Sequence, residues 1–296
     1  MNPPEVLVSG YASIDEAYTV SRLAGPAQTG ILSGPVRPEA RHGGCGPNTA
    51  RALARLGVET GLVTWVGDDP EGHALLDGLK EAGVDVTGVE MGRGLSPRSL
   101  LMYDRNGDAA CYFHPSGSAG QRVGPAVKAR LDTVPWLAIT VGPSSLTEQL
   151  LDRRGPTTRL AWNVKADPAS FPPDLCRRLM DADLVCLNRG ELTFLAAALQ
   201  LPPSVEPMQL VERGAGCVVL TRGAEGYLVA TMAGTVERPV EQIASEDPTG
   251  AGDAFFAGVL ASLVRGQPPV DAAAAGARVA ADFLASRGRP PAEVPS

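Results

Sequence analysis

Short apolar runs alternate with helix-like segments along most of the chain, and this alternation limits the possible folds more than any other feature. Runs such as VLVSG at 6–10 and TGLVTWVG at 60–67 precede segments in which apolar residues recur every three or four positions. The pattern is typical of βαβ units, whose strands form a mostly parallel sheet flanked by helices. The sequence therefore predicts an α/β fold.

The same pattern predicts where the individual elements lie. Glycines such as Gly57 and Gly83 end the first two expected helices. The predicted strands cover 6–10, 60–67, 136–141, 159–164, 183–187 and 216–221. The predicted helices cover 47–57, 69–83, 145–153, 173–180, 190–199, 204–213, 250–265 and 269–286.

Two segments interrupt this alternation, at 11–42 and 96–114. The second has the pattern of a hairpin, with Asn106-Gly107 as a strong two-residue turn. We expect a small β-sheet that acts as a lid over the carboxyl ends of the main strands, where ligands bind in open α/β sheets. Two long surface hairpins would have the same pattern. The expected main domain comprises 1–10, 43–95 and 115–296.

Composition and charge exclude several classes of protein. A net charge of −7 without any basic run argues against nucleic-acid binding. The five cysteines contain no C-x-x-C pair, which argues against a disulfide framework or structural zinc and favours the reducing cytoplasm. The sequence predicts neither a signal peptide nor a membrane span. We therefore expect a cytoplasmic protein with a small-molecule ligand.

The segment DPTGAGDAFFAG at 247–258 places glycines at the start of a predicted helix. Thr249 can cap this helix, and Gly250 and Gly252 fall in its first turn. Backbone N–H groups in a first turn have no intrahelical partner, and the helix dipole favours negative charge there. The segment can therefore hold an anion such as a phosphate.

Asp253 lies within the same first turn and has two interpretations. An acid near a helix N-terminus complements the dipole, which contributes roughly 0.3–1 kcal/mol. Alternatively, the carboxylate takes a proton from an alcohol while the N–H groups stabilise a transferring phosphoryl group. The residues alone leave both interpretations open.

The glycine-rich segment resembles a signature of the ribokinase-like (PfkB) family of carbohydrate and nucleoside kinases. A second family signature is matched by GGCGPNTARALARLG at 43–57. Further similar motifs follow the order of the family over nearly the whole chain. The resemblance implies a ribokinase-like fold, ATP as phosphoryl donor and Mg²⁺. The further motifs that carry the resemblance are SGYASID at 9–15, the stretch 66–86, NRGE at 188–191 and TRGAEG at 221–226.

The resemblance assigns the chemistry to the 247–258 segment. It implies that Asp253 is the catalytic base that deprotonates the incoming hydroxyl. It also implies that Gly250, Ala251, Gly252 and the N–H group of Asp253 form an anion hole for the transferred phosphoryl group.

Substrate contacts are implied for five residues. Asp15 would hold sugar hydroxyls, although an acid in a turn is its alternative role. Gly43 and Gly44 would let the backbone approach the substrate. Asn48 would hydrogen-bond a hydroxyl, or else simply start a helix. Phe113 would stack on a ring of the substrate.

Cofactor contacts are implied at the carboxyl ends of the later strands. Asn188 and Glu191 match the family motif that organises Mg²⁺ and its waters, for which one carboxylate is adequate; helix capping is the alternative. Thr221 and Gly223 would contact the nucleotide. Lys165 ends a predicted strand, where it either meets a phosphate or is solvated.

Several positions depart from the family pattern. Asn163 lies near a position that is often Asp, and Cys45 lies where ribokinases proper carry a lysine, which weakens ribose as the substrate. Ala277 replaces a polar residue beside the adenine, which puts those contacts in doubt. A requirement for K⁺ near Asp247 and Thr249 stays open.

The identity of the acceptor alcohol also stays open. We expect a sugar kinase that phosphorylates a hydroxymethyl group, with a nucleoside kinase as the alternative, in which Phe113 or Tyr112 stacks on the base. Those aromatics could instead pack the lid against itself. A non-catalytic sugar or nucleotide sensor is a second alternative, which the retained Asp253 and Glu191 argue against. Exposed lid strands commonly pair between subunits, so a homodimer through the lid is expected.

Overall fold

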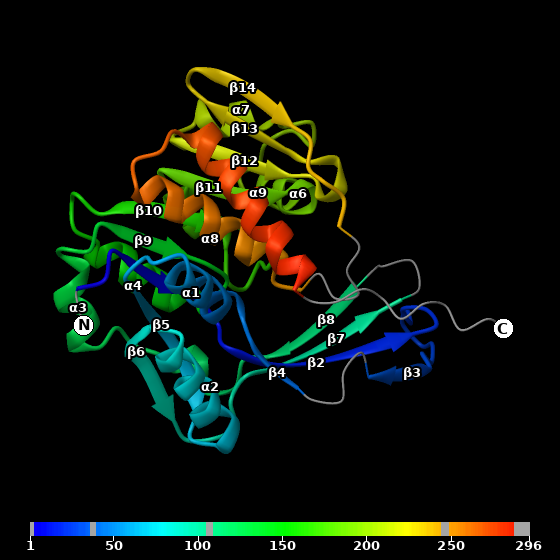
Figure 1. The fold of residues 1–296 in the computed structure, drawn as a ribbon. Helices are drawn as coiled ribbons and strands as arrows, with labels where there is room; N and C mark the ends of the chain where they lie inside the picture. The colour runs from blue at the N-terminus through cyan, green and yellow to red at the C-terminus, as the bar shows by residue number, and fades with distance from the viewer. Residues whose placement is uncertain (1–2, 36–39, 105–108, 244–248, 287–296) are drawn as a thin grey trace.

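A large sheet with helices on both sides carries a smaller sheet at one end (Figure 1). The computed structural model describes residues 3–35, 40–104, 109–243 and 249–286. The predicted α/β class, with a mostly parallel sheet and a second, smaller sheet, is confirmed.

The large sheet has nine strands in the order β14-β13-β12-β11-β10-β9-β1-β5-β6. Pairing is parallel from β12 through to β6, and β13 and β14 add an antiparallel edge. The strands are β1 (Val6–Ser9), β5 (Thr60–Gly67), β6 (Asp85–Gly92), β9 (Trp136–Ile139), β10 (Arg159–Asn163), β11 (Leu184–Asn188), β12 (Cys217–Thr221), β13 (Tyr227–Thr231) and β14 (Gly234–Arg238).

Helices cover both faces of this sheet because both faces are apolar. Along β9, Leu137 and Ile139 belong to one buried cluster, whereas Trp136 and Ala138 belong to the other. The first cluster includes α3 (Pro125–Leu131), α4 (Ser144–Arg153), α5 (Pro173–Leu179), α6 (Arg189–Ala198) and α7 (Pro207–Val211); the second includes α1 (Cys45–Arg55), α2 (Pro70–Glu81), α8 (Ala251–Val264) and α9 (Pro269–Ala285).

Helix α8 is the most deeply buried helix of the second layer. Its residues from Asp253 to Leu263 are all buried, so it lacks the exposed polar face of a surface helix. It packs against α1 and α9. Within the described part of the chain, no helix has both the length and the apolar character needed to cross a membrane.

The smaller sheet joins two segments that are far apart in the sequence. Strands β3, β2, β7 and β8 lie side by side, β4 pairs with β2, and β7 and β8 form the expected antiparallel pair. The Asn106-Gly107 turn lies outside the described residues. These strands are β2 (Ser13–Val20), β3 (Leu32–Pro35), β4 (Arg41–Gly43), β7 (Arg98–Tyr103) and β8 (Ala109–His114).

The structure also contains elements that the apolar pattern did not predict. These are α3, the edge strand β6 and the β13–β14 hairpin. Helix α7 is shorter than the predicted 204–213 because it begins at Pro207, where Glu206 and Gln209 form a capping box.

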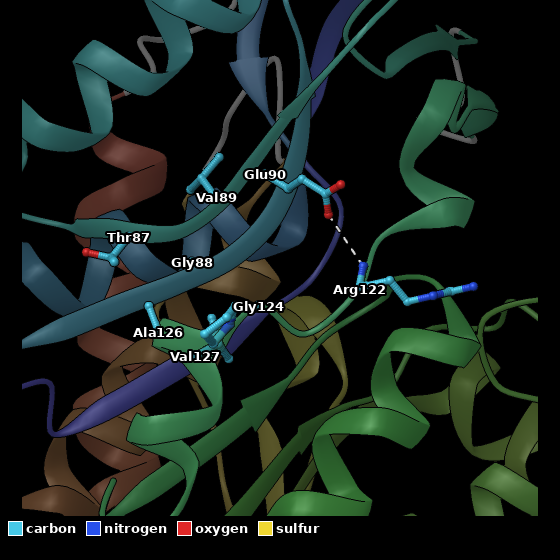
Figure 2. Close-up of a pocket in the computed structure, with 9 residues that line it drawn as sticks. Thr87, Gly88, Val89, Glu90, Arg122, Gly124, Ala126 and Val127 are labelled. Atoms are coloured by element: carbon cyan, nitrogen blue, oxygen red, sulfur yellow. Dashed lines mark hydrogen bonds between the residues drawn. The ribbon is translucent and has the colours of Figure 1, made fainter.

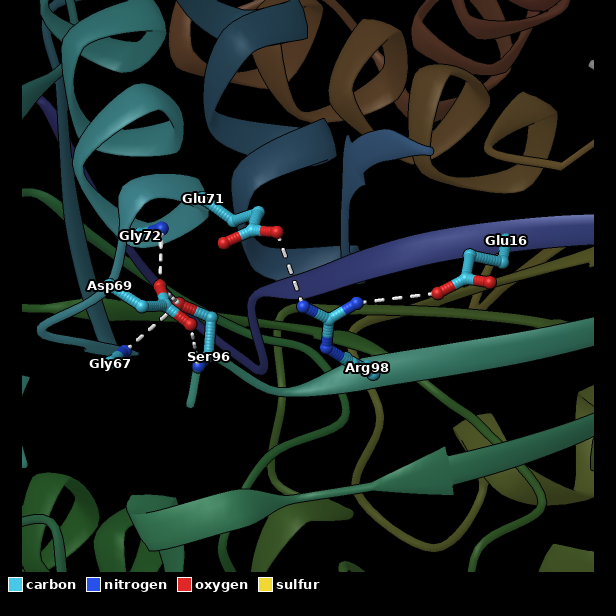
Figure 3. A network of polar contacts seen from close by, with 7 residues as sticks. All are labelled: Glu16, Gly67, Asp69, Glu71, Gly72, Ser96 and Arg98. Carbon is cyan, nitrogen blue, oxygen red and sulfur yellow. Dashed lines mark hydrogen bonds and ion pairs between the residues drawn. The ribbon is translucent and has the colours of Figure 1, made fainter. Parts of the chain in front are cut away.

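A buried carboxylate ties the two sheets together where β5 ends (Figure 3). Asp69 caps α2 by accepting from Gly72 N at 2.7 Å, and it also accepts from Ser96 N at 2.7 Å and Ser96 Oγ at 2.6 Å. Gly67 N in turn donates to Ser96 Oγ at 3.1 Å. Because Ser96 leads into β7, Asp69 fixes the point at which the chain enters the smaller sheet.

Arg98 makes a second connection at this junction (Figure 3). Its guanidinium pairs with Glu16 on β2 at 3.3 Å and with Glu71 in the first turn of α2, also at 3.3 Å. One cation on β7 therefore bridges an acid of the smaller sheet and an acid of the large domain.

Replacing Asp69 with alanine is expected to lower the free energy of unfolding by about 2–4 kcal/mol, since a helix cap is lost and buried donors lose their acceptor. Burial opposes ionisation of Asp69, but hydrogen bonds from Ser96 and Gly72 and the charge of Arg98 outweigh it and lower the pKa. Its contribution is therefore complete at neutral pH and is lost as the pH falls through this lowered pKa.

Urea denaturation at neutral and acidic pH measures this effect. The adjacent Asp68, which pairs with His73 at the surface, provides the matched control, and Asp68→Ala should change the stability by less than about 0.5 kcal/mol. Equal losses in the two variants, or a loss in Asp69→Ala that does not diminish in acid, would contradict the assignment.

Candidate active site

Several of the predicted site residues, among them Asn48, Lys165 and Asp253, lie close together where α8 begins. The predicted cap, Thr249, is wrong by one residue: Gly250 is the N-cap of α8 and has a left-handed backbone, with φ of 90°. A Cβ atom there would lie 3.1 Å from the Phe283 ring and 3.4 Å from Asn48 Nδ2, so a glycine fits this position best. The first helical bond of α8 is Ala254 N to Gly250 O, at 2.9 Å, which leaves the preceding N–H groups available to an anion.

Asp253 lies in this first turn with only 4% of its surface exposed. Asn48 Nδ2 donates to its Oδ2 at 3.1 Å, and Asn163 Nδ2 donates to its Oδ1 at 3.3 Å. The Cys45 thiol is also hydrogen-bonded to this carboxylate. An acid that only complements the helix dipole needs neither burial nor several hydrogen-bond donors, so the environment of Asp253 exceeds what that role requires.

The electrostatics of Asp253 suit a proton acceptor. Burial raises the pKa of Asp253, although the charge of Lys165 and the hydrogen bonds from Asn48, Cys45 and Asn163 act in the opposite direction. A carboxylate with a raised pKa is a stronger base, which is the property that general-base catalysis needs. Burial and the nearby Asp253 also raise the pKa of Cys45, so its thiol stays protonated and can donate.

Lys165 follows β10 and reaches the first turn of α8. Its Nζ lies 4.0 Å from where a Cβ atom on Gly252 would be, and 3.3 Å from Glu191 Oε1. Burial alone would lower the pKa of Lys165, but the groups around it, Cys45, Glu191 and Asp253, raise it overall, so the ammonium is charged. Lys165 is partly exposed and paired with Glu191, and its contact with a phosphate stays a prediction.

Glu191 and Asn188 form a full capping box at the start of α6. Asn188 N donates to Glu191 Oε2 at 2.8 Å, and Glu191 N donates to Asn188 Oδ1 at 2.9 Å. The structure therefore contains the helix cap that the sequence allowed, and Glu191 Oε1 faces Lys165.

Within the described residues no group of three His, Cys, Asp or Glu could hold a metal. Since Mg²⁺ keeps several waters, the pair of Glu191 and Asn188 fits a hydrated ion held through water.

The nucleotide-contact candidates lie beside this capping box. Thr221 ends β12 in register with Asn188 of β11, and its Oγ1 donates to Leu187 O at 3.4 Å. Gly223 follows in a short 3₁₀ turn. Ala277 on α9 packs against the buried cluster that includes α8.

Of the suggested cation ligands, Asp247 lies outside the described residues, whereas Thr249 contacts the Tyr103 hydroxyl of β7.

Asp15 and Phe113 face the same side of the smaller sheet. Asp15 is in register with Ser99, and Ser99 is in register with Phe113. A Cβ atom on Gly43 would fall 1.8 Å from Asp15 Oδ2, so the carboxylate occupies the space that a side chain there would need. Gly44, which caps α1, follows directly.

Phe113 packs against an aromatic ring in the segment that links β1 to β2. The centroids of Phe113 and Tyr11 are 4.7 Å apart at 51°. Tyr11 follows β1 and is hydrogen-bonded to Ser170, so this pair bridges the two sheets. Tyr112 is 61% exposed and belongs to the opposite side of the smaller sheet from Phe113.

Four residues near the site were not predicted to have a role. Asn163 and Cys45 were noticed only as departures from the family pattern, and Ser99 and Tyr11 were not singled out. Only Cys45 shares its element with a predicted site residue, Asn48 of α1, and the tertiary structure brings these four side chains to Asp253, Asp15 or Phe113.

A separate cavity of about 370 Å³ opens between β6 and α3 (Figure 2). Its lining includes Thr87, Glu90, Arg122 and Val127, and Arg122 N donates to Glu90 Oε2 at 3.4 Å. None of the predicted site residues lines it, so the candidate chemistry belongs to the end of α8.

Sequence comparisons agree with this geometry. The model of the pfkB family of carbohydrate kinases matches residues 4–289. A fructokinase from Rhizobium leguminosarum bv. trifolii is 32% identical over 237 residues, which span 75% of this chain and 71% of that protein. A nucleoside kinase from Methanothermobacter thermautotrophicus is 26% identical over 88% of this chain and 83% of its own.

Solved structures show the same fold. The nucleoside kinase of Methanocaldococcus jannaschii superposes with a TM-score of 0.78 at 19% identity, covering 96% of this chain and 93% of that one. The ribokinase of Cryptococcus neoformans var. grubii serotype A in complex with ADP gives a TM-score of 0.76 at 22% identity, covering 94% and 93%.

Proposed function

Because the chain belongs to the pfkB family of carbohydrate kinases, we propose that it transfers the γ-phosphoryl group of ATP to a hydroxymethyl group of a small sugar. Asp253 takes the proton of the hydroxyl as it attacks. The observation that carries the proposal is the buried Asp253 carboxylate, which has amide donors on both oxygens and lies in the first turn of a helix capped by a left-handed Gly250.

In the proposed reaction, the anion hole stabilises the negative charge of the transferred phosphoryl group. The N–H groups of 250–253 point where negative charge develops on the transferred phosphoryl group. Lys165 adds a fixed positive charge beside the same turn. A hydrated Mg²⁺, held by Glu191 and Asn188 through water, would neutralise charge on the ATP phosphates when bound.

Nucleotide and acceptor approach from opposite sides in this proposal. ATP lies along the ends of β11 and β12, where Thr221 and Gly223 contact it. The acceptor lies under the smaller sheet, where Asp15 and Asn48 bind its hydroxyls and the backbone at 43–44 allows close approach. This arrangement brings the attacking oxygen to Asp253. A monovalent cation near Thr249, on the nucleotide side, is part of the same proposal.

A nucleoside is the second candidate acceptor. The aromatic pair of Phe113 and Tyr11 favours it, because a planar base can stack against such a pair. A sugar remains the first candidate because two of the similar proteins are fructokinases, 32% and 28% identical to this chain.

An ATP-consumption screen tests the proposal and distinguishes the acceptors. ADP release is measured with Mg²⁺ over pentoses, hexoses, polyols and nucleosides. We expect acceptor-dependent release with at least one sugar. Release with nucleosides alone would favour the second candidate, and no release with any acceptor would favour a non-catalytic sensor.

We further propose that 11–42 and 96–114 act as a lid that closes over the acceptor and also as a homodimer contact. The side of the smaller sheet that carries Leu100 and Tyr112, which are paired across β7 and β8, exposes both residues. Limited proteolysis with and without acceptor and nucleotide tests closure of the lid, and sedimentation velocity measures the mass of the assembly.

A cytoplasmic location is proposed as well, since all five cysteines are free thiols.

A further inference from the structure

We propose that Asn163 is a positioning residue whose side-chain amide holds the Asp253 carboxylate in the orientation that receives the proton of the acceptor. The inference rests on the proposed role of Asp253 and concerns how this chain prepares that group for the reaction.

The geometry places one amide donor on each oxygen of the carboxylate. Asn163 ends β10, is 5% exposed and donates to Asp253 Oδ1 at 3.3 Å. Asn48 on α1 donates to Oδ2 at 3.1 Å. Donors from two different elements fix the plane of the carboxylate, since rotation about its last bond would break both hydrogen bonds. A base held in this way needs little reorganisation before proton transfer.

An amide is suited to this position because it donates without adding charge. A carboxylate at 163 would lie about as close to Asp253 as the present amide, and two carboxylates that share a site cannot both ionise easily. An alanine would simply remove the donor from Oδ1. The two substitutions therefore change the proton affinity of Asp253 by different amounts in the same direction.

Other groups around Asp253 stay in place in both variants. Cys45 and Asn48 face it from α1, and the ammonium of Lys165 faces it from the segment after β10, paired with Glu191 of α6. Asp15 of the smaller sheet acts on Cys45 at longer range. A change in pH dependence can therefore be assigned to position 163.

The test is the pH profile of kcat/KM for the full-length Asn163→Ala and Asn163→Asp variants with the acceptor found in the screen. For Asn163→Ala we expect kcat to fall at least about tenfold, KM for ATP to stay within about threefold, and the acidic limb to move to higher pH. For Asn163→Asp the acidic limb should move up by about one pH unit or more. Asn163→Asp is nearly isosteric, so it also tests the proposal should the alanine variant fail to fold.

Thr158→Val is the matched structural control. Thr158 lies at the other end of β10, is buried and donates to Val134 O at 2.7 Å. Its replacement should lower thermal stability without moving the pH profile. If the Asn163 variants behave as Thr158→Val does, losing stability but keeping kcat and the profile, the positioning role is overturned.

A double variant separates this inference from the proposed function. If Asp253 is the base, adding Asn163→Ala to Asp253→Asn should cause little further loss of turnover, because both changes act through one group. Near-normal turnover in Asp253→Asn alone would overturn the proposed function. A large loss in Asp253→Asn combined with an unchanged pH profile in Asn163→Asp would overturn only the role of Asn163.

Discussion

Replacing Asp253 with asparagine is expected to lower kcat by at least about 10³-fold while ATP still binds. The amide cannot accept the proton of the attacking hydroxyl, and it also disturbs the hydrogen bonds from Asn48 and Asn163. In the unaltered protein, the burial that raises the pKa of Asp253 implies a further effect. The base is active only when ionised, so kcat/KM should fall as the pH drops through this raised pKa.

Steady-state kinetics and a titration with ATP measure the two expectations separately. Asp271→Asn is the matched control, because Asp271 is an exposed acid in the first turn of the next helix, α9. That variant should retain nearly normal kcat. Near-normal turnover in Asp253→Asn would remove Asp253 from the mechanism.

Replacing Lys165 with methionine is expected to lower kcat by about 10²-fold or more. The ammonium lies beside Gly252 in the anion-holding turn, where a fixed positive charge stabilises a transferring phosphoryl group. Its removal also leaves the buried carboxylate of Glu191 without its ion-pair partner. We therefore expect a raised KM for ATP and lower thermal stability alongside the lost turnover.

Two further variants distinguish the effect of the Lys165 charge from a general effect of losing a lysine. Lys165→Arg keeps the positive charge and should recover part of the turnover that methionine loses. Lys80→Met removes a surface lysine, paired with Asp77 on α2, and should leave kinetics unchanged. Turnover of Lys165→Met within about threefold of the unaltered protein would show that the ammonium does not act on the phosphoryl group.

The central strands were predictable because their apolar runs are strong and short. Strand β5, for example, spans the predicted 60–67, and each of its residues is buried. Strand β6 was missed because Gly88 and Glu90 interrupt its apolar pattern at the sheet edge. In the β13–β14 hairpin only the edge strand β14 is mostly exposed, whereas β13 is buried along most of its length and was missed because it follows none of the predicted βαβ units. Edge strands bury less surface, so their sequences carry a weaker signal.

The site was predictable where a residue lies in a local motif. Gly250 has the left-handed backbone that a glycine at a helix start permits, and Asp253 lies in the first turn as expected. Contacts between distant segments were not predictable in the same way. Asn48 and Asn163 are 205 and 90 positions from Asp253 in sequence, and only the packing of α1 and β10 against α8 brings their amides to it.

Glu191 shows a second limit of prediction from the sequence, because one motif can fit two different roles. The sequence motif N-x-x-E fits both a capping box and a magnesium site, and the structure contains the capping box. A capped Glu191 still presents Oε1 toward Lys165 and the α8 turn. The capping box uses Oε2 and the ion pair uses Oε1, so the structure accounts for both oxygens, and the magnesium role stays a prediction.

Following the γ-phosphate itself tests the central claim most directly. ATP labelled at the γ-phosphorus is mixed with excess enzyme, Mg²⁺ and the acceptor found in the screen, and the products of a single turnover are separated. We predict that the label appears in a phosphate ester of the acceptor, without release as inorganic phosphate, and that Asp253→Asn forms no ester on the same time scale. Label that stays in ATP with every acceptor, or that passes to the acceptor equally fast in Asp253→Asn, would contradict it.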